Sequence, residues 1–317
     1  MTLELIIEPR VSMSWTDFKD QKGPYSIALD GYVTHRTMRD RKGPYANFDH
    51  HMRCDRFSTI ATCGQVYNEV RNHMMEDSFQ KDGQPHAHIY VNDPDEDTEL
   101  ASFILLNHED PKIIHSPFLK DLVLYEEEAD RMGGAILDIN PELQRAVESI
   151  FGPYNNARFK EDFLDMDSDD MRVVFDATHK RIYDYLTGKE PTGEYTIPEE
   201  LRKFDILHQG TDWILTQEYS QMSRIKMFRE GHKRFIALLG ESNSRYRYSI
   251  GRKSEWVDFD LKTLYKMLNK VEAELVYHGN LWGGSNTIGG SPRFTGSHLP
   301  PEELFRIIEE WTNKHPL

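Results

Sequence analysis

The sequence predicts an α/β protein of two domains: an N-terminal, mostly parallel and doubly wound sheet over residues 1–200, and a smaller mixed-sheet α/β domain over residues 201–317. Three observations support this. A chain of 317 residues is long enough for two cores. Short apolar segments in the first half each end at acidic or histidine residues and alternate with helical patterns. Residues 188–198 hold two prolines and two glycines, which is typical of a linker, and the pattern changes beyond them.

The composition indicates a soluble cytoplasmic protein. The hydrophobic share is 38% and the charged share 29%. No apolar run approaches the roughly 18–20 residues of a membrane helix, and the first ten residues lack the pattern of a secretory signal. The two cysteines, Cys54 and Cys63, are expected as reduced thiols, with a disulfide as the alternative.

The charge limits the choice of partners. The chain carries 38 basic and 53 acidic residues, a net charge of −15. Such a balance argues against a protein that coats long nucleic acid through phosphate contacts. It permits a small phosphorylated substrate held by metal ions, because the ions reverse the local sign.

Two strands are expected first, over residues 3–7 and 25–29. The second ends at Asp30-Gly31. A carboxylate at the end of a strand is where open α/β sheets keep their active groups. The alternative is an ordinary Asp-Gly turn.

The triplet Asp49-His50-His51 follows another short apolar run. At a strand end both imidazoles can reach one pocket, and carboxylate with imidazole suits Mn²⁺, Fe²⁺ or Zn²⁺. The small residues over 58–67 predict a helix packed under the histidine pair.

A polar loop is expected over residues 76–87, then a strand over 87–91 and a helix over 98–106. Asp95-Glu96-Asp97 lies between the last two. Helix capping would explain one or two acids there. An Asp-x-Asp at the mouth of a buried strand also fits a metal site, because the mutual repulsion favours a cation. Further on, Asp130 precedes a glycine pair and is a candidate to point inward.

The remaining chain is predicted in less detail. Residues 141–201 are expected to form connecting amphipathic helices, and residues 234–240 and 245–251 to form strands. A helix capped by Asp258 is expected over 259–276, and a closing helix over 300–311.

A glycine-rich stretch over residues 282–297 is the expected anion-binding element. Glycines let backbone N–H groups approach an anion, and an arginine can grip phosphate bidentately. The alternative is a merely flexible loop. No Gly-Lys-Ser/Thr opens a helix here, so the stretch is not a P-loop. The candidate substrate-binding residues are Ser285, Gly289, Gly290, Ser291 and Arg293.

Taken together, these motifs resemble the DHH phosphoesterase superfamily. The triplet Asp49-His50-His51 matches the motif that names the family, Asp30 matches the strand-end Asp before it, and the glycine-rich stretch resembles the loop of the associated DHHA1 domain. The resemblance covers most of the chain apart from the middle helices. Here the Asp-x-Asp motif follows the triplet instead of preceding it, which suggests a permutation. The family often has a histidine where this chain has Val91.

The resemblance implies a metal-dependent phosphoesterase with its active site in the cleft between two domains. Asp30 would bridge two ions, with Mn²⁺ expected and Mg²⁺ or Co²⁺ as alternatives. Asp95 would hold one ion, and the other would be held by Asp97, His50 and Asp130. His51 would contact the scissile phosphate, and Asp49 would orient an imidazole. Asp93, His35 or His88 could replace the ligand absent at Val91.

The expected substrate is a nucleotide, a short oligonucleotide or pyrophosphate, and a homodimer is possible. Two rival hypotheses are a catalytically inactive nucleotide-binding or regulatory protein on the same fold, and a structural protein whose acids only cap helices.

Overall fold

The computed structural model describes residues 2–51, 58–134, 136, 138–159, 163–189, 197–277 and 280–314. Over these residues it is a mixed α/β protein, as predicted, and it contains two six-stranded sheets. The chain forms two compact units. Unit 1 comprises Met1–Glu128, Glu142–Tyr154 and Met166–Tyr195, and unit 2 comprises Ala129–Pro141, Asn155–Asp165 and Thr196–Leu317. The proposed domain boundary after residue 200 stays a prediction.

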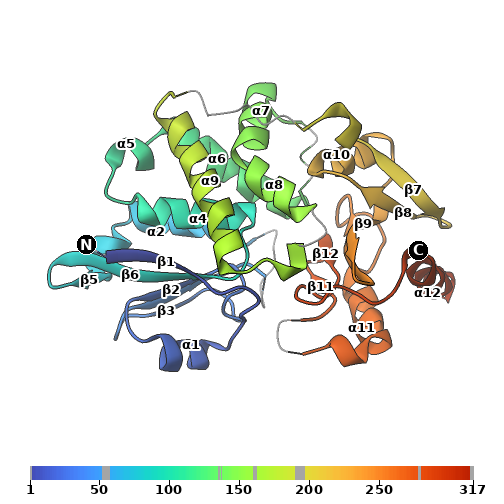
Figure 1. Ribbon diagram of the computed structural model, residues 1–317, viewed down its shortest axis with the longest axis horizontal. Helices are drawn as coiled ribbons and strands as arrows, with labels where there is room; N and C mark the ends of the chain where they lie inside the picture. The colour runs from blue at the N-terminus through green and yellow to red at the C-terminus, as the bar shows by residue number, and fades with distance from the viewer. Residues whose placement is uncertain are drawn as a thin grey trace. The chain divides into compact units, whose positions relative to one another are not determined.

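The sheet of unit 1 is mostly parallel (Figure 1). Its order is β1-β6-β2-β4-β3, with β5 paired to β6. The pairs β1–β6, β6–β2 and β2–β4 are parallel, whereas β3 and β5 pair antiparallel. The strands are β1 (Thr2–Ile7), β2 (Ser26–Leu29), β3 (Met38–Asp40), β4 (Tyr45–Phe48), β5 (Gln80–Lys81) and β6 (Gln84–Val91).

Helices cover both faces of this sheet. On one face lies α1 (Trp15–Lys22), whose Phe18 packs with Tyr32 and Tyr90. On the other lie α2 (Thr62–Arg71) and α4 (Glu96–Leu106), as Figure 1 shows. The other helices in the first two-thirds of the chain are α3 (Met74–Asp77), α5 (Pro111–Ile114), α6 (Pro117–Arg131), α7 (Pro141–Ile150), α8 (Gly152–Arg158), η1 (Phe163–Asp165) and α9 (Ser168–Leu186).

Several predicted boundaries in unit 1 were wrong. The loop expected over 76–87 contains the end of α3, then the hairpin β5–β6. Asp82 (φ 54°) and Gly83 (φ 72°) form its turn, where both central residues have positive φ. The helix expected from residue 58 begins at Thr62, and the helix expected from residue 98 begins at Glu96. Residues 190–196 of the proposed linker lie outside the described residues.

Unit 2 is built on a mixed sheet in the order β11-β12-β10-β9-β8-β7. Only the β8–β9 pair in this path is parallel. Its strands are β7 (Phe204–Gln209), β8 (Ile214–Glu218), β9 (Arg234–Ser242), β10 (Arg245–Arg252), β11 (Gly283–Gly284) and β12 (Ile288–Gly290). The sequence predicted β9 and β10 but not β7 or β8.

One face of this sheet carries the core of unit 2. Trp213, Ile236 and Trp282 pack there with buried residues of α11 (Leu261–Val271) and α12 (Pro301–Lys314). The remaining helices are α10 (Gln221–Arg229), η2 (Glu199–Leu201) and η3 (Ala273–Leu275). The helix cap predicted at Asp258 was wrong, because the carboxylate of Asp260 accepts a hydrogen bond from the N–H of Thr263 and α11 begins at Leu261.

No helix among the described residues is long and apolar enough to cross a membrane.

Candidate metal centre

The candidate residues of unit 1 lie where three neighbouring parallel strands end. β6, β2 and β4 are adjacent and run the same way, so their carboxyl ends share one edge of the sheet. Asp30 follows β2, Asp49 follows β4, and Asn92 follows β6. The sheet therefore brings these segments together although the Asp-x-Asp motif comes last in the chain.

Asp30 is held in an unusual backbone conformation. Its φ is 41°, in the left-handed region, and Gly31 follows with φ 82°. The side chain of Asp30 is only 1% exposed. Its N–H donates to the carbonyl of Phe48, which ties the end of β2 to the end of β4. Non-glycine residues keep such conformations only where the surroundings impose them, and these positions cluster at functional sites.

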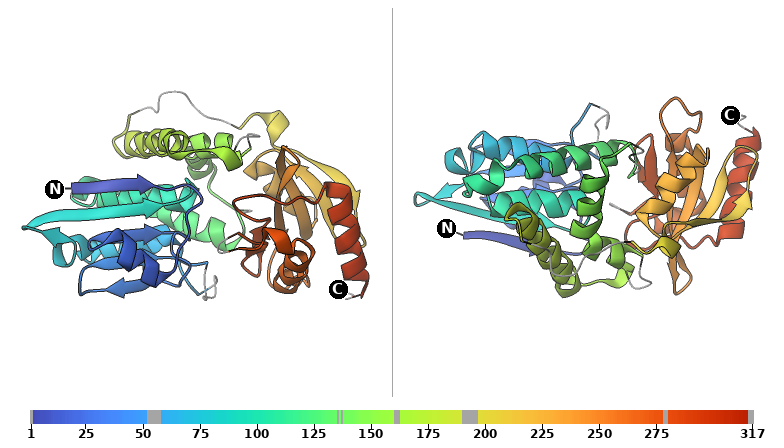
Figure 2. Two further views of the ribbon diagram at one scale, coloured as in Figure 1. Left: turned by 60° about the horizontal axis from the view of Figure 1, so that its bottom comes forward. Right: turned by 90° about the horizontal axis from the view of Figure 1, so that it is seen from above.

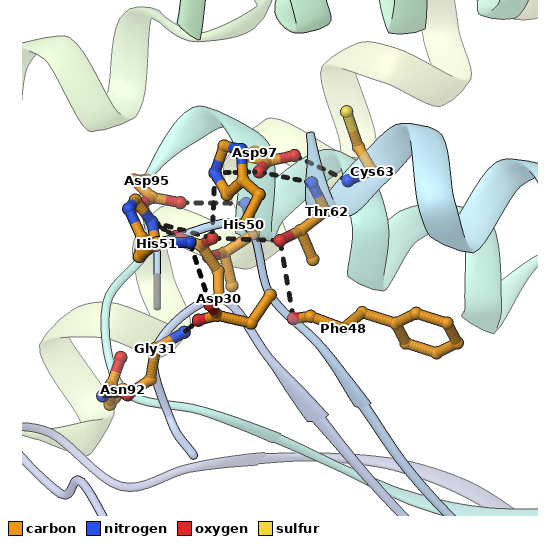
Figure 3. Close-up of polar contacts among 12 residues, drawn as sticks. Asp30, Gly31, Phe48, His50, His51, Thr62, Cys63, Asn92, Asp95 and Asp97 are labelled. Carbon is orange, nitrogen blue, oxygen red and sulfur yellow. Dashed lines mark hydrogen bonds and ion pairs between the residues drawn. The ribbon is translucent and has the colours of Figure 1, made fainter. Parts of the chain in front are cut away.

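Both histidines of the triplet turn toward Asp30 (Figure 3). The Nε2 atom of His51 lies 2.9 Å from Oδ1 of Asp30 and 3.0 Å from Oδ2. The Nε2 atom of His50 lies 3.4 Å from Oδ1 of Asp30. One donor atom from each of the three residues lies within 4.8 Å of the others, a spacing that could hold a metal ion. One carboxylate and two imidazoles are ligands that first-row divalent metals accept.

Charge in this group favours an ionised carboxylate. Burial alone would raise the pKa of Asp30. The charge of His51 and hydrogen bonds from His50 and His51 outweigh burial and hold that pKa well below its ordinary value. Asp30 is therefore a carboxylate at neutral pH, the form that binds a cation.

Asp49 supports the backbone around this group. Its Oδ2 accepts a hydrogen bond from the N–H of Gly31 at 2.9 Å, and its Oδ1 accepts one from the N–H of His51 at 2.8 Å. These contacts join the turn after β2 to the turn after β4. They are backbone contacts, whereas the sequence suggested that Asp49 would orient an imidazole.

The Asp-x-Asp residues both cap helices. Asp95 is the N-cap of α4 and accepts from the N–H of Thr98 at 2.9 Å. The two oxygens of Asp97 accept from the N–H groups of Thr62 and Cys63 at the start of α2, at 2.8 and 2.6 Å. This arrangement satisfies amides that a helix leaves unpaired.

Asp97 also borders the metal group. Its Oδ2 lies 3.4 Å from Nε2 of His50. The structure thus places Asp97 next to the group of Asp30, His50 and His51 without including it among the three. Beside Asp97, Cys63 is a buried free cysteine, and burial together with the charge of Asp97 raises the pKa of its thiol. Cys54 lies outside the described residues.

Thr62 is a site residue that the sequence analysis missed. Its buried hydroxyl donates to Oδ1 of Asp30 at 3.0 Å and so fixes the carboxylate that faces both histidines. A second support is Gln65, whose side-chain amide donates to the carbonyl of Asp49 at 3.2 Å. The helix expected under the triplet indicated where such residues would lie, but nothing in the sequence showed which of them would face Asp30.

Three residues were proposed to replace the metal ligand that is absent at Val91, and two of them do not lie with Asp30, His50 and His51. Among the described residues, neither His35 nor His88 belongs to the metal-compatible group. His88 lies within β6, with Nε2 3.8 Å from Oε2 of Glu4. Val91 itself is fully buried at the end of β6. Asp93 follows β6 and remains a candidate, as does Asp130, which lies on α6 in the segment assigned to unit 2.

In unit 2, the glycine-rich stretch forms the hairpin β11–β12 beside β10. A side chain at Gly289 would lie 2.2 Å from the carbonyl oxygen of Gly283, and one at Gly290 would lie 2.5 Å from that of Tyr248. These glycines therefore allow the strands to approach closely. This packing explains the glycines without a ligand, and anion binding by the hairpin stays a prediction.

The polar residues of the stretch have structural contacts as well. The hydroxyl of Ser285 accepts from the N–H groups of Thr287 and Ile288, at 3.1 and 3.0 Å. The hydroxyl of Ser291 accepts from the N–H of Tyr248 at 3.0 Å. Arg293 is exposed just beyond the hairpin. Its role in holding phosphate stays a prediction.

Comparison with known proteins adds little to these observations. No protein-family model matches the sequence, and no curated protein matches it. Among solved structures, the chain is similar to a DHH-domain protein described as a member of a family of ribosomal proteins, with 13% identity and a TM-score of 0.31. The alignment covers 85% of this chain, which spans 63% of that protein. The similar structure bears the domain name that the sequence motifs suggested.

Proposed function

We propose that this chain is a metal-dependent phosphoesterase of the DHH type that hydrolyses a small phosphorylated substrate. The observation that carries the proposal is the group of Asp30, His50 and His51 at the carboxyl edge of a parallel sheet. The group joins a buried, ionised carboxylate to two imidazoles, a donor set that fits Mn²⁺. The resemblance implied Asp30 and His50 as metal ligands and His51 as the residue that contacts the scissile phosphate, and the grouping of all three favours His51 as a ligand as well.

Each residue has a defined task in this proposal. Asp30, His50 and His51 would hold a metal ion, which when bound supplies a Lewis acid and lowers the pKa of a bound water. Thr62 and Asp49 position these ligands through the contacts described above. As the resemblance implies, Asp97 and Asp130 would belong with His50 to one ion, and Asp95 would hold a second ion. Arg293 with the β11–β12 hairpin would bind the phosphate of a nucleotide, short oligonucleotide or pyrophosphate.

The metal site can be tested without knowing the substrate. Titration of metal-free protein with Mn²⁺ by calorimetry should show binding that His51→Ala weakens by about 10-fold or more, the range found when the groups around a metal are disturbed. His88→Ala is a matched control, because the side chain of His88 is 31% exposed and that of His51 is 30% exposed. Equal Mn²⁺ affinity in wild type and His51→Ala would contradict the site.

Activity needs a separate test. Protein supplied with Mn²⁺ should hydrolyse at least one of pyrophosphate, dinucleotides, cyclic dinucleotides or short single strands, and Asp30→Asn should abolish that activity. Mg²⁺ and Co²⁺ in the same assay would identify the preferred ion. Absence of hydrolysis across these substrates, with Mn²⁺ bound, would contradict the enzymatic assignment.

A second candidate is a nucleotide-binding or regulatory protein that lacks catalysis. Two observations favour it: both oxygens of Asp97 already accept hydrogen bonds from α2, and Val91 stands where the family often has a histidine. Both features reduce the ligands for a second ion. This alternative predicts nucleotide binding without turnover in the same screen.

A further inference from the structure

Strand β7 forms an open edge of the unit 2 sheet. It is the last strand in the order β11-β12-β10-β9-β8-β7, and among the described residues its only strand partner is β8. No strand in the described part of the chain pairs with the N–H and C=O groups on its other side. Open edges of this kind are the sites at which extended peptides add to a sheet.

The edge is apolar as well as open. Ile206 is 46% exposed and Leu207 is 39% exposed. The pairing with β8 shifts register between Ile206 and His208, so Leu207 is an extra residue in a β-bulge. Bulges at an edge oppose indiscriminate pairing of flat strands, so a segment that adds here must fit the bulged strand.

A cavity adjoins this strand. Its volume is about 660 Å³, and it is lined by His208 of β7 together with Pro300 and residues of α12. The ring of His208 stacks on that of Phe305, with 4.8 Å between the ring centroids. The centroid of the Phe305 ring lies 5.2 Å from that of Trp213, so these three aromatic side chains pack together beside the cavity. Both views of Figure 2 show α12, in red, beside the yellow strands that include β7. The acidic residues that line the cavity are Glu302, Glu303, Glu309 and Glu310.

The lining charge selects the kind of occupant. Four carboxylates and one guanidinium, that of Arg306, line the cavity. Glu310 is paired with Arg306 at 3.2 Å, and Glu309 accepts hydrogen bonds from Thr211 and Trp213, so the negative charge most open to an occupant is that of the exposed Glu302 and Glu303. A second copy of this chain docked edge to edge would bring a second acidic helix toward the first, and like charges across an interface oppose docking. A segment with basic side chains would instead be attracted.

We propose that β7 and α12 form a docking groove for an extended, basic and partly apolar segment of a partner protein. The segment would add to β7 as a strand, its apolar side chains would cover Ile206 and Leu207, and its basic side chains would meet the glutamates of α12. This site lies within unit 2 and is independent of the proposed phosphoesterase activity.

The probe is a short fluorescently labelled peptide in which lysine and valine alternate. The control peptide has glutamate in place of each lysine. Fluorescence anisotropy should show binding of the lysine peptide only, and hydrogen exchange should show slower exchange of β7 amides in its presence. The exposed pair Glu302→Lys/Glu303→Lys should weaken binding by about 10-fold or more, which corresponds to about 1.4 kcal/mol. Ile206→Lys should weaken it as well.

The matched control is Glu255→Lys/Glu274→Lys, which makes the same change in net charge at exposed positions elsewhere in unit 2. An equal loss of binding in this control would show general electrostatic attraction and overturn the proposal. So would unchanged exchange of the β7 amides. A dimer seen by light scattering and dissociated by Ile206→Lys would also overturn it, since the occupant would then be a second copy.

Discussion

At the scale of single residues, the hydrogen bond from the Thr62 hydroxyl to Asp30 can be tested by removing one donor while keeping the shape of the side chain. It donates to Oδ1 of Asp30 at 3.0 Å from a fully buried position. Thr62→Val keeps the shape but leaves the carboxylate without this donor, so we expect Mn²⁺ affinity to fall by about 10-fold, the lower end for residues that orient metal ligands. Calorimetric titration measures the loss. Thr62→Ser keeps the hydroxyl and should bind Mn²⁺ like wild type; equal weakening in both variants would point to packing.

Asp97 allows its capping and metal roles to be separated. Both its oxygens accept from α2 amides, so Asp97→Asn would place an amide N–H₂ against one backbone donor. We expect the free energy of unfolding to fall by about 1–2 kcal/mol, as for lost helix caps. Urea denaturation with a chelator present measures this without any metal. An unchanged midpoint would contradict the capping role and leave metal binding as the reason for the carboxylate.

Residue identities were predicted better than residue roles. The pattern of an apolar run ending in Asp-Gly located Asp30, and Asp-His-His located its neighbours. Asp97 was assigned to metal binding from the Asp-x-Asp pattern alone. Its capping contacts were not predicted, because the amides that it accepts from belong to Thr62 and Cys63, more than thirty positions away in sequence. A hydrogen bond between such distant segments depends on how α2 and α4 pack, which no local pattern encodes.

At the scale of elements, the packing of α9 on α4 contains a titratable group. The Nε2 atom of His179 lies 3.0 Å from the carbonyl oxygen of Glu99 and 3.0 Å from Oγ of Ser102. Burial lowers the pKa of His179 to about 4, from an ordinary value of 6.5. Between these two values the unfolded chain binds the proton more tightly than the folded protein, so the free energy of unfolding falls as the pH is lowered.

This difference can be measured with one variant. From pH 7 to pH 5 the wild type should lose about 1–2 kcal/mol more stability than His179→Gln, which cannot titrate. His179 is half-buried, so the expected loss of stability is smaller than the full difference between the two pKa values would give. Urea unfolding of both proteins at the two pH values gives the comparison. Parallel losses in both proteins would mean that His179 titrates normally in the folded state.

Two of the missed strands, β5 and β7, were missed for a related reason. The Asp82-Gly83 turn is a strong local signal for a hairpin, but β5 and the start of β6 are polar and were assigned to a loop. Strand β7 has four exposed residues out of six, and so lacks the alternation that marks a half-buried strand. Edge strands depend on a neighbouring strand for their conformation, and that neighbour is not visible in their own sequence.

At the scale of the whole molecule, charge is unevenly divided along the chain. The chain has 53 acidic and 38 basic residues, yet residues 197–317 contain nearly equal numbers of each, so the acidic excess lies in residues 1–196. This part contains the group of Asp30, His50 and His51. An acidic surround raises the local concentration of cations and opposes phosphate, so the metal is expected to bind before the substrate.

Binding of Mn²⁺ should therefore stabilise one part of the molecule selectively. When the Mn²⁺ concentration is a hundred times the dissociation constant, binding adds about 2.7 kcal/mol to the free energy of any opening or unfolding that destroys the site. Hydrogen exchange of amides in β2, β4 and α2, the elements around Asp30, should slow by up to about a hundred-fold. Amides of β8 and β9 belong to unit 2 and should respond less. Asp30→Asn should remove the effect. Uniform slowing in both units would instead show that they unfold as one cooperative body, and unchanged exchange around Asp30 would contradict metal binding there.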